Sequence, residues 1–141
     1  MLAILTHLSA SYERYGVTIN ELLDSAVTEN FNFYECQFTG IGTLTTPSTI
    51  NLYRGSANCG VNMVACVFSF CQAKDGGAFS LWDYMDCNVK LICAYGCKAA
   101  NSGGCCVIKL ASSFNASHIS AVSCESACKN FFFSGVHLSQ T

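Results

Sequence analysis

Apolar positions follow a short-range alternation that is interrupted by glycine-containing corners. Large apolar or sulfur-containing side chains recur at every second position over 34–38, 64–68 and 91–95. A strand with one buried face requires this period of two. Corners such as 74–77 and 101–104 follow, where glycine adopts positive φ without a steric penalty. The pattern therefore predicts short strands joined by tight corners.

The strand and corner segments repeat along the chain with a period near 30 residues. A first column of equivalent positions has intervals of 30, 27 and 31 residues and contains Cys36, Cys66, Cys93 and Cys124. A second column follows four or five residues later and contains Ile41, Cys71, Cys97 and Cys128. Gly77 and Gly104 mark an equivalent corner in two of the units. Self-similarity at a fixed period is the signature of a solenoid.

This repeat predicts an all-β, right-handed parallel β-helix of about four to five coils in a single domain, residues 1–141. Equivalent residues of successive coils would lie above one another in a narrow bore, where buried, unoxidised cysteine behaves as a small apolar residue. Residues 1–30 form either a degenerate first coil or a cap, in which 20–27 would be a short helix. The domain itself is either complete or a fragment of a longer solenoid.

Composition excludes several classes of protein. Hydrophobic residues make up 51% and charged residues 11% of the 141 residues, which excludes a disordered chain. The net charge of −2 and the lack of a basic cluster exclude nucleic acid as a partner. We expect no membrane span, because no apolar run approaches the required length of about 18 residues. Eleven cysteines favour an extracellular or cell-surface location, although 1–5 form no clear signal peptide. A secreted, disulfide-rich domain of irregular structure is an alternative to the solenoid.

The segment 66–79, CVFSFCQAKDGGAF, resembles the Cys/Phe and Gly-Gly-Ala repeat of polymorphic-outer-membrane-protein-like surface proteins, within the pectin-lyase-like β-helix superfamily. A looser copy occupies 94–105, and the resemblance is best over 62–107. In that family an Asn usually stands three places after the Phe, where this chain has Cys71. The resemblance implies a right-handed β-helix that serves adhesion or display at a cell surface. No catalytic residue carries over from the family.

One segment carries candidate chemistry. Asp83 and Asp86 are closely spaced carboxylates beside Trp82 and Tyr84. Two such carboxylates could protonate a leaving oxygen and activate water in a polysaccharide lyase or hydrolase, and the two rings could stack on a sugar. The alternative is a solvated loop without catalysis, on which the rings bind a glycan. The cysteine spacings never form the Cys-x-x-Cys knuckle of a zinc site, so we expect no metal or cofactor.

The C-terminal segments indicate how an end of the predicted solenoid could be covered or extended. The aromatic run 131–133 could cover an open coil, and 135–141 reads as a further strand. We therefore expect end-to-end self-association or a longer solenoid. The favoured function is a non-catalytic structural or adhesive surface module whose partner is a protein or glycan, with the Asp83/Asp86 enzyme as the alternative.

Overall fold

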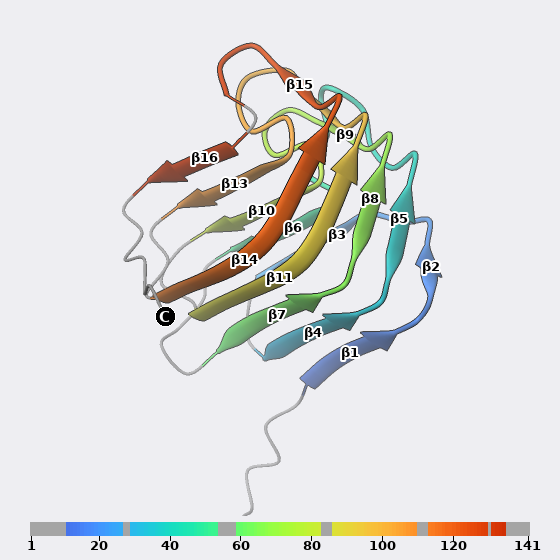
Figure 1. Ribbon diagram of the computed structural model, residues 1–141, viewed down its shortest axis with the longest axis vertical. Coiled ribbons are helices and arrows are strands. Elements are labelled where there is room, and N and C mark those ends of the chain that lie inside the picture. The colour runs from blue at the N-terminus through green and yellow to red at the C-terminus, as the bar shows by residue number, and fades with distance from the viewer. Residues whose placement is uncertain are drawn as a thin grey trace, which may run out of the picture.

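The computed structural model describes residues 11–26, 29–53, 59–82, 86–109, 113–129 and 131–134. This part of the chain forms sixteen strands and no helix. The strands wind around a common axis and pair in parallel with their equivalents in the neighbouring turns (Figure 1). The predicted all-β parallel solenoid is therefore confirmed.

Three sheets form the faces of the solenoid. The largest sheet bends along its length and contains β1 (Ser11–Tyr15), β2 (Thr18–Ile19), β4 (Asn30–Tyr34), β5 (Gln37–Thr39), β7 (Gly60–Val64), β8 (Val67–Ser69), β11 (Asp86–Tyr95) and β14 (Ser113–Val122). The second sheet contains β3 (Leu23–Ala26), β6 (Ile50–Tyr53), β10 (Phe79–Trp82), β13 (Cys106–Lys109) and β16 (Phe131–Ser134). The third and smallest contains β9 (Gln72–Ala73), β12 (Lys98–Ala99) and β15 (Glu125–Ser126).

The turns differ in how many sheets they enter. Three successive turns, β7 to β10, β11 to β13 and β14 to β16, place a strand in every sheet. The two preceding turns, β1 to β3 and β4 to β6, supply only the two larger sheets. The molecule thus has about three complete turns with a period of about 27 residues, slightly different from the predicted four to five coils of about 30.

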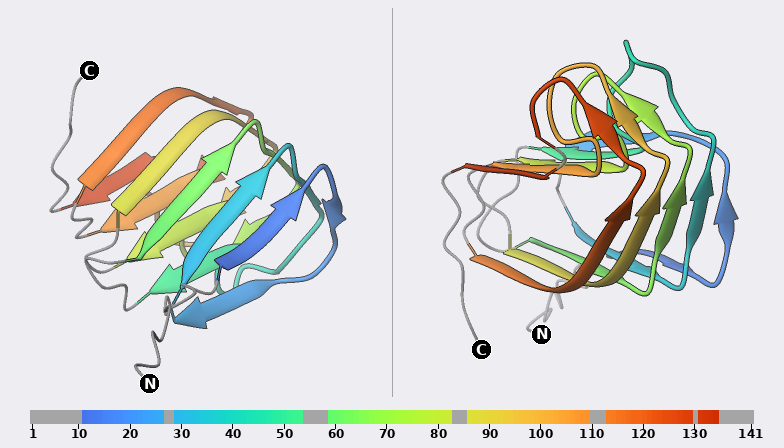
Figure 2. Two further views of the ribbon diagram at one scale, coloured as in Figure 1. Left: turned by 90° about the horizontal axis from the view of Figure 1, so that it is seen from below. Right: turned by 45° about the horizontal axis from the view of Figure 1, so that its top comes forward.

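The largest sheet bends where one residue in each turn adopts a left-handed backbone conformation (Figure 2). In β11 and β14 the strand continues through the bend at Leu91 and His118, both with φ of 54°. In the two turns before β11, the same place is taken by Glu35 (φ 56°) and Ala65 (φ 57°). The bend turns the chain toward the next face, and the side chain that follows it points into the bore.

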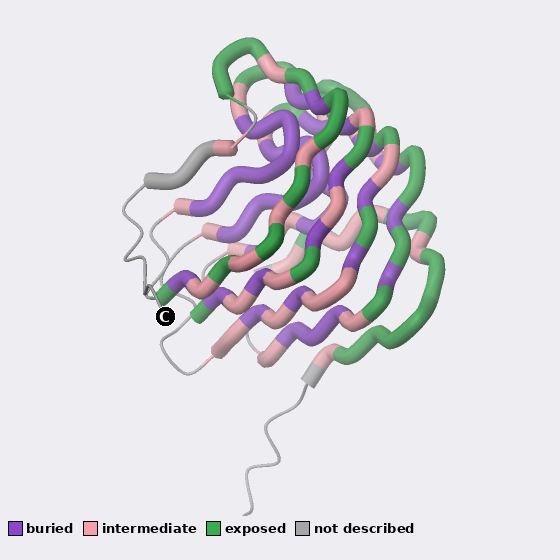
Figure 3. The backbone as a smooth tube through the Cα atoms, in the orientation of Figure 1, coloured by how far each residue is buried: buried purple, intermediate pink, exposed green. Residues whose placement is uncertain are grey.

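Apolar side chains from all three sheets fill the bore. Phe33, Phe38, Phe68 and Phe79 are completely or almost completely buried. The rings of Phe38 and Phe68 stack in adjacent turns, with centroids 4.6 Å apart and planes within 5°. Figure 3 shows buried and less buried positions alternating along the strands. Burial of such stacked apolar side chains stabilises the described turns of the solenoid.

Of the two alternatives for 1–30, the cap with a short helix over 20–27 is wrong for the described residues. Residues 23–26 form β3, which pairs in parallel with β6 so that Leu23 lies opposite Ile50. Residue 27 lies outside the described residues. Leu22 and Leu23 pack against the core, and backbone pairing to an existing strand overrides the modest helix propensity of this segment. Residues 11–26 therefore form a first turn of the solenoid and not a helical cap.

Candidate functional site

Trp82 lies at the end of β10 on the outer face of the second sheet. Phe79 and Leu81 point into the bore, so alternation along the strand turns Trp82 outward, where it is half-buried. Its neighbour in the next turn, Lys109, places its Nζ 4.4 Å from the centroid of the indole ring. This is the geometry of a cation–π contact, which fixes the ring and covers one of its faces. The indole Nε1 is buried and has no hydrogen-bond partner among the described residues.

Trp82 lines an open surface pocket of about 240 Å³. The floor comes from outward-facing residues of β6 and β10, and the walls come from two corner segments; the lining is Thr45, Thr46, Pro47, Ser48, Asn51, Lys74, Asp75, Ser80 and Trp82. Asn51 is held in place by Asp24 of the preceding turn, since its Nδ2 donates to Asp24 Oδ1 at 2.9 Å. The pocket therefore combines one aromatic ring with hydroxyl, amide and charged groups.

The Asp75 corner is tied down on the sheet by hydrogen bonds. The hydroxyls of Ser48 and Ser80, which also contact each other, donate to the backbone oxygen of Asp75 at 2.6 and 3.3 Å. The Asp75 carboxylate accepts from Ser102 Oγ at 3.1 Å and from Asn101 Nδ2 at 3.4 Å. Both Ser48 and Ser80 are buried although they belong to the outer face. The wall of the Trp82 pocket is thus a fixed part of the fold.

The two predicted corner glycines stack on each other. The Gly77 amide donates to Gly103 O at 2.8 Å, and the neighbouring Ala78 amide donates to Cys105 O at the same distance. A Cβ atom on Gly77 would collide with the backbone oxygen of Gly104. The close approach of the two corners explains why glycine is required at this position of the repeat.

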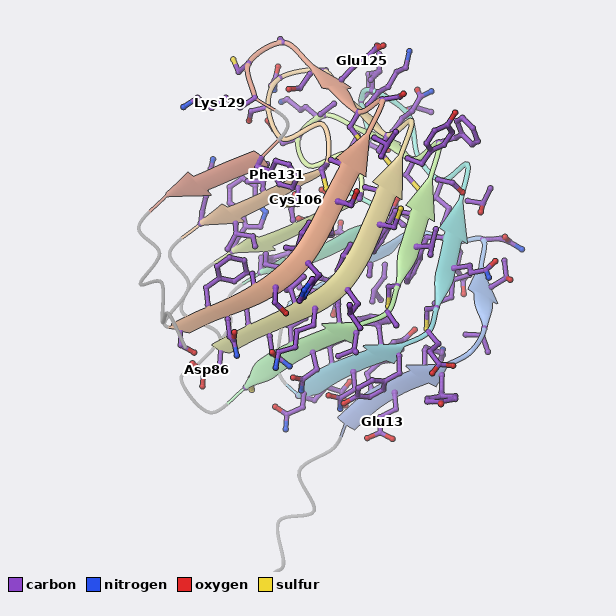
Figure 4. The ribbon with its side chains drawn as sticks, viewed as in Figure 1. Glu13, Asp86, Cys106, Glu125, Lys129 and Phe131 are labelled. Carbon is purple, nitrogen blue, oxygen red and sulfur yellow. The ribbon has the colours of Figure 1, made fainter. Side chains whose placement is uncertain are left out.

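The structure does not bring Asp86 into the Trp82 pocket. Asp86 begins β11 on the largest sheet (Figure 4), where its Oδ1 accepts from Ser113 Oγ at 2.8 Å. It lines a different open pocket of about 360 Å³, which Asn62, Asn88 and Lys90 also line. Asp83 and Tyr84, the other predicted members of this site, lie outside the described residues.

A ladder of asparagine side chains crosses the outer face of the largest sheet. Asn62 Nδ2 donates to Asn32 Oδ1 at 2.9 Å, and Asn88 Nδ2 donates to Asn62 Oδ1 at 3.1 Å. The same row contains Glu13 before Asn32 and Asn115 after Asn88. The recurrence of Asn32 and Asn62 is visible in the sequence. Asn88 is not recognisable by a fixed period, because it follows Asn62 by 26 residues whereas Asn62 follows Asn32 by 30.

The first predicted cysteine column needs a correction. Cys36 and Cys66 lie at the same place in adjacent turns, since the amide of Val67 donates to Cys36 O and Gln37 pairs with Val67. Cys93, however, pairs with Val67 and Ser120 and is only half-buried. The inward position above Cys66 belongs to the buried Ile92, because this turn is shorter and the bend falls one residue earlier.

The second column also differs from the prediction at its last member. Pairing of β9, β12 and β15 places Cys71, Cys97 and Cys124 above one another, and Ile41 precedes them in the same row. Cys124 therefore belongs to this column and not to the first. Cys128, which the sequence assigns here, is exposed beyond β15, where its amide donates to Asn101 O at 3.1 Å. Each of the three stacked cysteines directly follows a residue with a left-handed backbone, which is Phe70, Gly96 or Ser123. This shared position places Cys124, and not Cys128, in the second column.

All eleven cysteines are free thiols, so no disulfide holds this fold together. Each column thiol lies close to backbone oxygens, as Cys97 Sγ does to Phe68 O at 3.6 Å. Hydrogen bonding to Cys124 and Cys71, together with burial, raises the pKa of Cys97. At the end of the column, the hydrogen bond from Cys97 lowers the pKa of Cys124 to about 7, against the effect of burial. The thiols thus act as small, polarizable core residues.

Within the described part of the chain, no group of three His, Cys, Asp or Glu side chains has an arrangement that could hold a metal ion. Over the same residues, no helix is long and apolar enough to cross a membrane. No family model, curated protein or solved structure matches this chain. The stacked turns themselves define the class of the molecule, a cysteine-rich parallel β-solenoid repeat protein.

Proposed function

We propose that this chain is a non-catalytic structural or adhesive surface module that binds a glycan in the Trp82 pocket. One observation carries the proposal: a half-buried indole ring stands at an open pocket that is otherwise lined by hydroxyl, amide and charged side chains. Sugars present apolar C–H faces and many hydroxyl groups. An aromatic ring with a few fixed polar groups is therefore suited to them.

The pocket offers partners for both parts of a sugar. The Asn51 amide and the hydroxyls of Thr45 and Thr46 are positioned on the lining, and Lys74 adds a cation. A pyranose ring would use the face of the Trp82 indole that Lys109 leaves uncovered. The floor and the wall are held in place, because Asn51 bonds to Asp24 and the Asp75 corner bonds to Ser48 and Ser80. Binding would therefore order few protein groups, which favours affinity.

The family resemblance of 66–79 points in the same direction, because such repeats serve adhesion or display at cell surfaces. An extracellular or cell-surface location and membership of that family remain predictions. A β-solenoid is suited to adhesion, because it is a stiff stack of turns whose outward side chains form continuous rows.

A glycan array followed by calorimetry on the best ligand tests the proposal. We expect Trp82→Ala to weaken binding by about tenfold or more, the scale of a lost aromatic contact. Tyr95→Ala is the matched control, since Tyr95 is 45% exposed on another face and does not line the pocket. Absence of any glycan ligand, or equal losses in the two variants, would overturn the proposal.

The rival function, a polysaccharide lyase or hydrolase that uses Asp83 and Asp86, also remains a prediction. No observation favours it, because Asp86 and Trp82 line separate pockets. We expect a polysaccharide panel to yield neither reducing ends nor unsaturated products after incubation with the protein. Release of either product by the native chain, with loss of release in Asp86→Asn, would replace the binding module by the enzyme.

A further inference from the structure

We propose that copies of this chain stack head to tail, with β1, β2 and β3 of one copy extending the sheets beyond β14 and β16 of another. The occupant of each end is a second copy of the same chain. The Trp82 pocket lies on β6 and β10, inside the stack, and takes no part in this contact.

Both ends of the stack present strand edges. Within the described residues, β14 pairs only with β11 and β16 only with β13, while at the other end β1 pairs only with β4 and β3 only with β6. Figure 2 shows β1 and β14 at opposite ends of the stack. An exposed parallel edge is a template for a further strand, because half of its amide and carbonyl groups point away from the sheet.

The two ends match in strand register along the two larger sheets, whereas β15 of the last turn has no counterpart in the first turn. Following the strand register through β4, β7 and β11 places Ser113 of β14 at the same position in the turn as Ser11 of β1. The bend also coincides, since Gly16 (φ 59°) separates β1 from β2 where His118 (φ 54°) lies within β14. In the second sheet, register through β6, β10 and β13 makes Leu23 equivalent to Phe131. A translation by one turn therefore lays β1 and β2 of one copy beside β14 of another, and β3 beside β16.

Side chains at the two ends are complementary in this register. Glu13 of the second copy would lie beside Asn115, and an Asn amide already donates to this carboxylate within the chain, from Asn32 Nδ2 to Glu13 Oε1 at 3.5 Å. Partly buried apolar side chains border the core at both ends, with Tyr12 and Ile19 at one and Ile119 at the other. Figure 4 labels Glu13 on β1 and Phe131 on β16, at the two ends. Stacking would remove this apolar surface from water.

The symmetry of the contact decides the form of the assembly. The two joined surfaces differ, so the interface is heterologous, and translation along the solenoid axis does not close a ring. Stacking therefore gives open oligomers with a distribution of lengths. Sedimentation velocity of the full chain under reducing conditions should show a mean mass that rises continuously with concentration. A constant mass of 15.1 kDa over the series, or a closed dimer, would overturn the proposal.

A charge substitution tests the register of the contact. Asn115→Asp places a carboxylate against Glu13 of the next copy and should weaken association by about tenfold, the effect of two like charges at close range in partly screened surroundings. Adding Glu13→Gln to the same chain should restore association. Gln37→Glu is the matched control, because Gln37 is exposed on β5 inside the stack and away from both ends. Equal effects of Asn115→Asp and Gln37→Glu, or no rescue by Glu13→Gln, would contradict this register.

Discussion

Single residues in the left-handed conformation set the corners of each turn. Six residues other than glycine adopt positive φ in the described part of the chain: Glu35, Ala65, Phe70, Leu91, His118 and Ser123. Each precedes an inward-pointing side chain of the cysteine and isoleucine columns. L-amino acids pay roughly 1–2 kcal/mol for this conformation. The fold therefore stores local strain at these six bends, and the core packing that follows each bend offsets it.

Ala65→Gly should stabilise the protein by about 0.5–1 kcal/mol, because glycine removes the strain at φ 57° and loses only part of this gain to its flexible unfolded state. The reciprocal change, Gly40→Ala, should destabilise it by about 1 kcal/mol, since Gly40 has φ of 63° and open space around it. Urea unfolding measures both. Destabilisation by Ala65→Gly would show that the bend at this residue is not left-handed.

The asparagine ladder links successive turns through hydrogen bonds between single side chains. Asn62→Ala should lower the free energy of unfolding by about 1–3 kcal/mol, because it removes two hydrogen bonds and leaves Asn32 Oδ1 and the Asn88 amide without that partner. Asn101→Ala, at an exposed corner, should cost less than 1 kcal/mol. If chemical denaturation finds equal costs for the two variants, the ladder does not contribute in the way the structure indicates.

At the scale of elements, the glycine corners determine how closely successive turns approach. Gly77→Ala should destabilise the solenoid by about 3 kcal/mol or more, because the added methyl group meets the backbone oxygen of Gly104, which cannot move without shifting the next turn. Gly60→Ala is the matched control, since its nearest neighbour, Asp86 O, would be 3.4 Å from the new Cβ. Thermal unfolding of the two variants compares them, and a tolerant Gly77→Ala would argue against stacked corners.

The sequence predicts the elements better than their register. Alternation and glycine spacing identify strands and the stacked corners at Gly77 and Gly104, and these are where the structure has them. The prediction that cysteine follows cysteine in one column is wrong at Cys93. The length of the turns varies, and the inward position above Cys66 is taken by Ile92. The alternative of a helix over 20–27 is wrong for a related reason. Residues 23–26 pair with β6, which is distant in the sequence, and local helix propensity takes no account of such pairing.

The candidate site is only partly predictable. Trp82 is conspicuous as the single tryptophan beside two carboxylates, and the structure places it at a pocket. Its neighbours in that pocket, Asn51 and Asp75, belong to other segments and carry no local signal. Only the winding of the chain brings β6, β10 and the Asp75 corner together. Asp86 is the opposite case, because it is close to Trp82 in the sequence but lies on β11 and lines a different pocket.

At the scale of the whole molecule, the buried thiols predict how stability depends on pH. Burial raises the pKa of Cys66 to about 11 and that of Cys87 to about 12, from an ordinary value of 9.0. In the unfolded chain these thiols ionise near pH 9, so their contribution to folding is complete below pH 9 and is lost as pH rises toward 11 and 12. The free energy of unfolding should therefore fall over this range.

Urea unfolding under a phosphine reductant and argon measures this fall between pH 8 and 11. Cys66→Ala should reduce the pH dependence, whereas Cys128→Ala, at an exposed thiol, should leave it unchanged. A stability that rises between pH 9 and 11 would show that folding does not raise the pKa values of Cys66 and Cys87.

The chain winds so that residues nearly one period apart lie in contact in parallel strands. Nuclear Overhauser effects in the reduced protein can detect this winding through the ring protons of Phe38 and Phe68, whose stacked centroids are 4.6 Å apart. We predict a strong effect between these rings, which belong to β5 and β8 of adjacent turns. Absence of this contact, together with the short Hα–Hα contacts of antiparallel strands, would contradict the solenoid and the proposals built on it.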